Sequence, residues 1–182
     1  KNKSDKLMKE LHDLEWDTKY WDTRRQKVLN KHARYNLCFS DFDQDPDYSN
    51  KKGRVYDWNN LENLNKLRVK LDKLIKPVGY SLQCEGNKYY MSEKCGIGLH
   101  GDTERMRVIG CRLGETMNLC YQWFYQSKPV GDFFEINLDH GDIYFMSQKA
   151  VGCDWKKKNI HTIRHCAGGE KFMKNVHKGL SK

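Results

Sequence analysis

The sequence contains no apolar run that approaches the roughly 20 residues a membrane-spanning helix needs. It also contains no internal repeat and no low-complexity linker. The chain begins at Lys1 with no Met and no signal-peptide pattern. A fragment of a longer protein is therefore one expectation. These absences argue against a membrane partner and against a repeat array. We predict a single domain over residues 1–182, since this length suits one sizeable core.

A C-x-x-C pair is also missing, although the chain has seven cysteines. Neither a zinc ribbon nor a dithiol redox motif is therefore indicated. Most of the cysteines lie in apolar stretches, where a reduced cysteine behaves as a small hydrophobic residue. We predict a reducing compartment, the cytoplasm or the nucleus.

The net charge of +9 predicts an acidic partner, and nucleic acid is the first candidate. The lysines are spread along the chain rather than gathered in one block. A solvated, lysine-rich surface is therefore the competing interpretation.

The first part of the chain predicts helices and an extended segment. Leu7, Leu11 and Leu14 have helical spacing and precede a basic stretch at 24–27. The aromatic segment 31–42 is expected to be extended, and 43–53 a loop. A second helix is predicted from leucines on one face, with an Asn cap and a Pro and a Gly as its stop: Leu61, Leu64, Leu67, Leu71, Leu74, Asn59 or Asn60, Pro77 and Gly79.

After Tyr80 the pattern changes to short β-rich runs separated by turn residues. Strands are predicted at 81–90, 97–100, 107–113, 119–125, 133–138, 142–146, 160–166 and 171–175. Such spacing indicates a sandwich or barrel. We predict an α+β fold with a barrel core over 80–176 and an N-terminal extension over 1–58 that packs helices against it.

The most informative motif is His100-Gly101-Asp102, at the end of a predicted strand. Side chains two residues apart on a strand point to the same side, so this imidazole and carboxylate can bind one metal. A distal His would complete the two-His-one-carboxylate triad of non-haem Fe(II) oxygenases. H-x-D alone is common by chance. Its place before a β-rich half with a distal His favours a metal site over a surface His near a turn Asp.

These features resemble the AlkB-like branch of the Fe(II)/2-oxoglutarate-dependent dioxygenases, over most of the chain. In that family an N-x-Y motif precedes H-x-D and contacts 2-oxoglutarate, and Asn87 and Tyr89 match it with a slightly longer gap. The turn at 140–142 is similar to the family's turn before strand six, and we assign His140 a structural role there. The resemblance implies a double-stranded β-helix (jelly-roll), Fe(II), 2-oxoglutarate and O₂.

The C-terminal end departs from the family pattern. AlkB relatives end in an R-x-N-x-x-x-R strand whose arginines bind 2-oxoglutarate, but no Arg follows Arg164 here. If His161 is the distal ligand, Lys171 lies ten residues on, a spacing that resembles prolyl hydroxylases with an anchoring Lys. If His165 is the ligand, Lys171, Lys174 or Arg164 would hold 2-oxoglutarate.

The choice between the two distal histidines stays open on the residues alone. His161 and His165 have the same parity on one strand, so alternation does not separate them. Hairpin length favours His161. The R-H-x-A-G segment around His165 resembles R-H-A-A-G of related viral and environmental sequences, and we adopt His165 with His161 as the alternative.

Five residues are predicted to contact the substrate: Arg34, Tyr35, Glu104, Arg105 and Trp155. The segment 31–42 is similar to the family's basic, aromatic substrate lid, and Glu104 fits members that act on nucleic acid. Trp155 precedes three lysines, which suits a phosphate backbone, although a solvated loop is the competing interpretation. The aromatic run at 121–125 is more typical of a sheet face than of base stacking.

The resemblance and the charge together predict a dioxygenase that demethylates or hydroxylates a nucleobase in DNA or RNA. The His-to-Lys spacing supports an alternative, a protein or peptide hydroxylase or demethylase of the same superfamily. A second alternative is a non-catalytic nucleic-acid-binding module with a degenerate barrel. The intact H-x-D with a distal His argues against that module.

Overall fold

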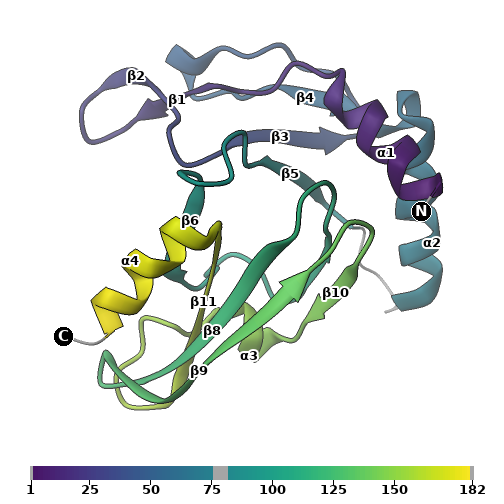
Figure 1. Cartoon of the computed structure of the whole chain (residues 1–182). Coiled ribbons are helices and arrows are strands. Elements are labelled where there is room, and N and C mark those ends of the chain that lie inside the picture. Colours follow the sequence, from purple (N-terminus) through teal and green to yellow (C-terminus); the bar gives the residue numbers. More distant parts are fainter. Residues whose placement is uncertain (1, 76–81, 181–182) are drawn as a thin grey trace. The chain divides into compact units, whose positions relative to one another are not determined.

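The computed structural model describes residues 2–75 and 82–180 and has an α+β fold (Figure 1). The chain divides into two compact units, which we call the N-terminal unit (Asn2–Tyr90) and the C-terminal unit (Met91–Lys182). Among the helices of the described residues, none has the length and apolar character that crossing a membrane requires.

Two helices of the N-terminal unit agree with the leucine spacing. Helix α1 spans Asn2–His12 and buries Leu7, and helix α2 spans Glu62–Ile75 and buries Leu64. The predicted Asn cap of α2 is wrong, because Asn59 and Asn60 belong to the short 3-10 helix η2 (Trp58–Asn60). The carboxylate of Glu10 in α1 instead accepts the backbone N–H groups of Asn63 and Leu64, each at 2.9 Å. The predicted stop residues Pro77 and Gly79 lie outside the described residues.

The N-terminal unit also contains two small sheets. Strands β1 (Lys19–Asp22) and β2 (Lys27–Asn30) form a hairpin, so the predicted basic stretch 24–27 is largely its turn. A three-stranded sheet has the order β4-β3-β5. Its strands are β4 (Val55–Asp57), β3 (Tyr35–Ser40) and β5 (Cys84–Lys88). The prediction of an extended segment at 31–42 is therefore confirmed for β3, and the 3-10 helix η1 (Tyr48–Asn50) lies in the predicted loop.

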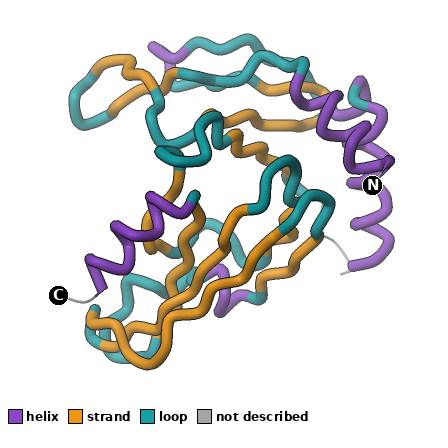
Figure 2. Tube along the Cα trace, viewed as in Figure 1, coloured by secondary structure: helices purple, strands orange, loops and turns teal. Residues whose placement is uncertain are grey.

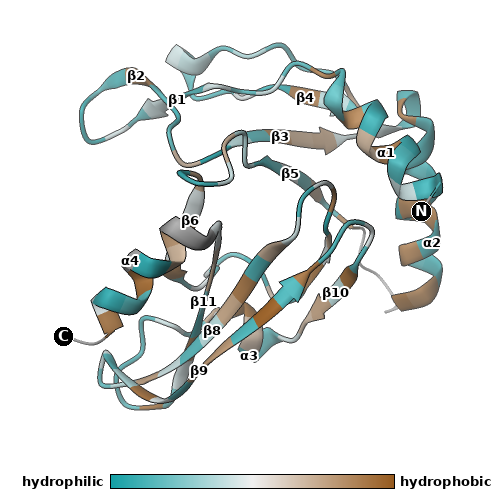
Figure 3. Ribbon diagram, viewed as in Figure 1, coloured by the Kyte–Doolittle hydropathy of each residue, from teal (hydrophilic) through white to brown (hydrophobic). Residues whose placement is uncertain are grey.

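The C-terminal unit contains the strands that position the candidate site. They are β6 (Gly96–His100), β7 (Val108–Cys111), β8 (Met117–Tyr125), β9 (Lys128–Leu138), β10 (Ile143–Met146) and β11 (Thr162–Gly168). Hydrophobic and hydrophilic residues alternate along β9 in Figure 3, as on a strand with two different faces. The short helix α3 (Gln148–Val151) precedes β11.

These six strands pair in a nested order. The first pairs with the last (β6 with β11), the second with the fifth (β7 with β10) and the third with the fourth (β8 with β9). One sheet has the order β6-β11-β8-β9, and the pair β10-β7 forms a second sheet. The described strands form no closed barrel, because β6 and β9 are the edges of the four-stranded sheet.

The predicted last strand, 171–175, is wrong. Residues Glu170–Leu180 form helix α4 (Figure 2), which packs against β6 and β11. Phe172, Met173 and Val176 have the spacing of one helix face, and they contact the core at Cys120 and Cys166. A Cβ added at Gly96 or Gly168 would lie 2.6 or 2.4 Å from the Phe172 ring, so these glycines make room for the helix.

The cysteines are all reduced in this structure. Cys95, Cys120 and Cys166 have no exposed surface, in agreement with their predicted role as small hydrophobic residues. Cys120 and Cys166 are register partners on β8 and β11 and pack with Met173.

Candidate metal centre

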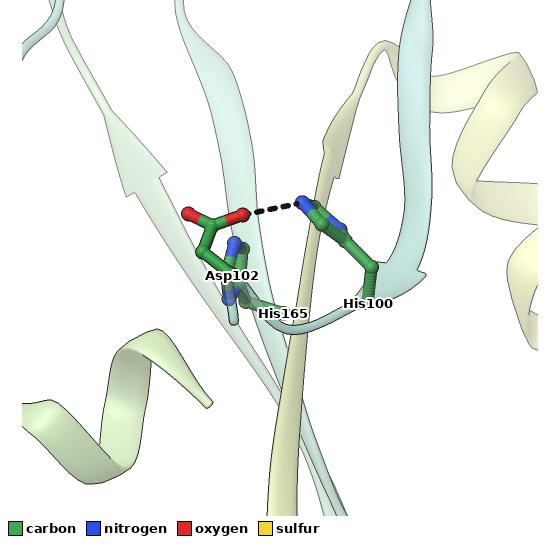
Figure 4. Close-up of side chains that lie close together, drawn as sticks. All are labelled: His100, Asp102 and His165. Carbon is green, nitrogen blue, oxygen red and sulfur yellow. Dashed lines mark ion pairs between the residues drawn. The ribbon is translucent and has the colours of Figure 1, made fainter. Parts of the chain in front are cut away.

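The three side chains adopted as metal ligands lie together in the C-terminal unit (Figure 4). His100 is the last residue of β6, and Asp102 follows in the turn after it. His165 lies in β11 and is the register partner of His100. Pairing of the two strands therefore places the distal histidine directly beside the H-x-D motif.

The ligand atoms are close enough to share one cation. One nitrogen or carboxylate oxygen from each residue lies within 4.8 Å of the other two. His100 Nε2 is 3.4 Å from Asp102 Oδ1, and the two imidazole centroids are 4.4 Å apart. Ligand atoms held at right angles about one metal are separated by about 3 Å. The group can therefore hold a metal ion after small side-chain movements.

Neighbouring groups orient two of the three ligands. The Gly98 carbonyl lies 2.8 Å from His100 Nδ1, so Nδ1–H donates to it and the Nε2 lone pair faces Asp102. Arg105 donates to Asp102 Oδ2 at 3.1 Å, which leaves Oδ1 toward the histidines. The Asp102 N–H donates to the Val151 carbonyl at 3.0 Å and fixes the turn.

Gly101, between the two ligands, is required by close packing. A Cβ at this position would lie 2.2 Å from the Gly152 carbonyl oxygen and 2.6 Å from Trp155 Cδ1. Only glycine lets the turn after β6 approach the segment after α3 this closely. Packing therefore requires glycine between His100 and Asp102, the two candidate ligands of this motif.

Burial keeps the distal histidine uncharged. His165 is 7% exposed, and desolvation, with the nearby His100 adding to it, lowers the pKa of His165 to about 4. At neutral pH the imidazole is therefore neutral, the form that binds metals. A hydrogen bond with the Ala150 backbone opposes this lowering of the His165 pKa only in part.

His161 lies elsewhere on the C-terminal unit. It precedes β11, is exposed, and stacks on the ring of Tyr125 with centroids 4.8 Å apart. It is absent from the group that could hold a metal. The geometry therefore favours His165 as the distal ligand.

The two basic residues predicted to anchor 2-oxoglutarate do not lie on the expected strand face. Arg164 neighbours His165 on β11, so its side chain points to the opposite face. Its guanidinium lies 3.9 Å from the centroid of Phe124. Lys171 belongs to helix α4 rather than to a last strand.

The predicted N-x-Y and lid residues lie in the N-terminal unit. The Asn87 side-chain oxygen accepts hydrogen bonds from Arg34 Nε and Asn36 Nδ2, both at 2.6 Å. Tyr35 stacks on Tyr90 with centroids 4.2 Å apart. Tyr89 follows β5 directly.

The remaining predicted residues are near the metal ligands in sequence or space. Glu104 is exposed and accepts from the Thr103 hydroxyl at 3.3 Å, while Arg105 forms an ion pair with Asp102. Trp155 packs against Gly101. His140 accepts the Gly114 N–H at 2.9 Å, in agreement with a structural role at its turn.

Tyr121 was not among the predicted site residues. Across the four-stranded sheet the register aligns His100, His165, Tyr121 and Phe134 on one face. The Tyr121 and His165 centroids are 6.3 Å apart. Burial raises the pKa of Tyr121 to about 12, so its hydroxyl remains a hydrogen-bond donor. In the sequence, Tyr121 is recognisable only as one of the alternating residues of a predicted strand. Its place beside His165 depends on the register between β8 and β11, which only strand pairing defines.

The fold and site thus define an α+β protein with a His-Asp-His group able to bind a metal. No family model matches the chain. Over 172 residues it is 53% identical to the uncharacterized protein R156 of Acanthamoeba polyphaga mimivirus, in an alignment covering 94% of this chain. The chain spans 66% of the length of that relative.

Proposed function

We propose that the chain is an Fe(II)- and 2-oxoglutarate-dependent dioxygenase that oxidises a nucleobase. The observation that carries this proposal is the convergence of His100, Asp102 and His165 on one point. Two imidazoles and one carboxylate are the ligand set of non-haem Fe(II) oxygenases, and they leave coordination positions for a cosubstrate and O₂.

The residues fit a catalytic ion better than a structural one. Structural zinc sites are closed by four ligands, usually including cysteines, whereas this group has three and no thiolate. Arg105 holds one carboxylate oxygen away, so Asp102 is set to bind through the other. A bound Fe(II) with 2-oxoglutarate would supply the oxidising chemistry.

The strand order supports the jelly-roll that the AlkB-like resemblance implies. A jelly-roll is a long hairpin rolled up, so its strands pair in nested order and alternate between two sheets. The pairs β6·β11, β7·β10 and β8·β9 follow that order, and the middle pair lies in its own sheet.

The cosubstrate's far carboxylate needs a donor on the metal-bearing face. Tyr121 lies in the same row as His165 and keeps its proton, so we assign it this donor role. Asn87, Tyr89 and Lys171 remain proposed contacts on the resemblance alone. Arg164 points to the other face of β11, where its guanidinium contacts Phe124.

A nucleobase is the proposed substrate because the chain carries a net charge of +9. Oxidation of a base requires that it be single-stranded or flipped out of a duplex. The chain would therefore act on a strand that its basic surface can hold.

The test is succinate production from 2-oxoglutarate with Fe(II), with and without methylated oligonucleotides. We expect turnover by the wild type and background levels for His100→Ala, Asp102→Ala and His165→Ala. His161→Ala is the matched control, because this histidine is exposed and outside the group. Wild-type production no higher than that of His100→Ala would contradict the proposal. Succinate coupled only to peptides would replace the nucleobase by a protein substrate.

A further inference from the structure

Arg164 is a cation without an acid partner. Its guanidinium carbon lies 3.9 Å from the Phe124 centroid and 5.2 Å from that of Trp155, so two aromatic rings hold it. No ion pair joins it to a carboxylate in the described part of the chain. Its Nε is buried without a hydrogen-bond partner. A partly buried guanidinium with no carboxylate partner has capacity to bind an anion.

Trp155 lies in contact with a second cation. Lys156 Nζ is 5.6 Å from the indole centroid, so Lys156 and Arg164 both lie near this ring. The indole Nε1 is buried without a partner. The ring is fixed by its packing against Gly101, so it is a rigid support for the two cations.

The segment 154–161, which we call the Trp155 loop, contains three lysines and one acidic residue. Its single acid, Asp154, is neutralised by Lys149 at 2.7 Å. Lys157 and Lys158 are exposed and form no ion pair within the described residues. Together with Lys156 and Arg164 they leave four uncompensated positive charges on one short stretch.

An exposed aromatic pair lies at the end of the same loop. Tyr125 is 38% exposed and stacks on His161 with an interplanar angle of 25°. The Gln126 N–H donates to the Lys158 carbonyl at 3.3 Å, which ties the turn after β8 to the loop. Basic side chains interleaved with exposed rings are the pattern that single-stranded nucleic acids bind.

We propose that the Trp155 loop and Arg164 bind the phosphate backbone of a single-stranded nucleic acid, with a base stacked beside Tyr125 and His161. Nucleic acid as the ligand rests on the proposed function, but binding here does not require turnover. The Arg164 side chain points to the face of β11 opposite to His165, but Trp155 packs against Gly101, between two of the candidate ligands, so the Trp155 loop lies beside the turn of the candidate metal centre. A lysine-rich solvated loop alone would not require a guanidinium fixed between two rings.

The test measures binding of a fluorescein-labelled oligothymidylate by anisotropy, at several salt concentrations, using His100→Ala protein. That background separates binding from catalysis, so loss of turnover and loss of binding are distinguishable. We expect Arg164→Gln to weaken binding about tenfold, because it removes a charged hydrogen bond to phosphate. We expect Tyr125→Ala to weaken it about fivefold or more.

The double variant Lys156→Ala/Lys157→Ala should lower the slope of log K against log salt by about 0.7 for each phosphate that is no longer neutralised. Lys178→Ala is the matched control, since it removes an exposed positive charge on α4. Arg164→Lys keeps the charge without the planar fork and should bind between Arg164→Gln and the parent. Circular dichroism and thermal unfolding check that each variant is folded.

Two results would overturn the inference. Arg164→Gln and the double lysine variant could bind as tightly as Lys178→Ala, with the same salt slope. Alternatively, inorganic phosphate could displace the oligonucleotide more strongly than chloride at matched ionic strength, which would assign the surface to free phosphate. Equal displacement by both salts, with weakened variants, is the expected result.

Discussion

In the N-terminal unit the buried carboxylate of Asp17 accepts hydrogen bonds from the Tyr48 hydroxyl at 2.7 Å and the Arg54 N–H at 2.8 Å. In the C-terminal unit two buried side-chain nitrogens, Trp155 Nε1 and Arg164 Nε, have no hydrogen-bond partner within the described residues. Trp21 Nε1 is the corresponding exception in the described part of the N-terminal unit. Buried polar groups are normally paired, so the unpaired atoms of the C-terminal unit favour it as the unit that binds a ligand.

The largest expected effect tests whether the two units are separate in stability. Met173 is 3% exposed in the C-terminal core, and Met173→Ala should lower the free energy of unfolding by about 2–5 kcal/mol. Hydrogen exchange should show the loss in residues 91–180 and not in 2–75. Leu64→Ala is the matched change in the N-terminal unit. Equal loss of protection in both units would break the comparison.

The second prediction concerns pH in metal-free protein. The folded-state pKa of His165 is about 4, below its ordinary value of 6.5, so the unfolded chain binds this proton more readily. Stability from this group should be complete above about pH 6.5 and be lost as the pH falls toward 4. Chemical denaturation in chelator should show this loss in the wild type and a flatter profile in His165→Gln. Parallel profiles would mean that burial does not control this histidine.

The third prediction compares Gly98 in β6 with Gly101 in the turn after it. Gly101→Ala should lower the free energy of unfolding by about 1–3 kcal/mol, because the added methyl overlaps Gly152 and Trp155. Gly98→Ala is the control, since a Cβ there has nothing within 4 Å. Thermal unfolding of both variants measures the difference. Similar melting temperatures would show that the turn can relax around the methyl group.

The smallest expected effect concerns the affinity of the candidate centre for a metal ion. Arg105→Ala should leave the fold intact and weaken metal affinity about 10–100-fold, since Arg105 orients Asp102 from outside the ligand set. Titration with Mn(II) measures the affinity without oxidation. Glu104→Ala, at an exposed neighbour with no bond to the ligands, is the matched control. An unchanged affinity for Arg105→Ala would reduce this contact to a surface ion pair.

Several features could be predicted from local sequence because they depend on local geometry. The leucine spacing predicted both N-terminal helices, and seven of the eight predicted strands overlap observed ones. H-x-D was recognisable because alternation on a strand places residues two apart on one side. The same alternation places the side chains of Arg164 and His165 on opposite faces of β11.

Other features depend on contacts between distant segments. The sequence does not separate His161 from His165, which have the same parity; the start of β11 at Thr162 and its register with β6 do. Phe172, Met173 and Val176 have helical spacing, but a strand was predicted there because short strands precede this segment at regular intervals. Helix α4 is stable because Gly96 and Gly168 leave space for Phe172.

The α+β class, the H-x-D pair of His100 and Asp102, and a net positive charge suited to an acidic partner can all be predicted from the amino-acid sequence alone. These follow from composition and from the period of side chains along one segment. Tertiary structure decided which histidine joins them, which residues share their face and where Arg164 lies without an anion. Strand pairing decides these points, because it joins residues dozens of positions apart and no local pattern specifies the register.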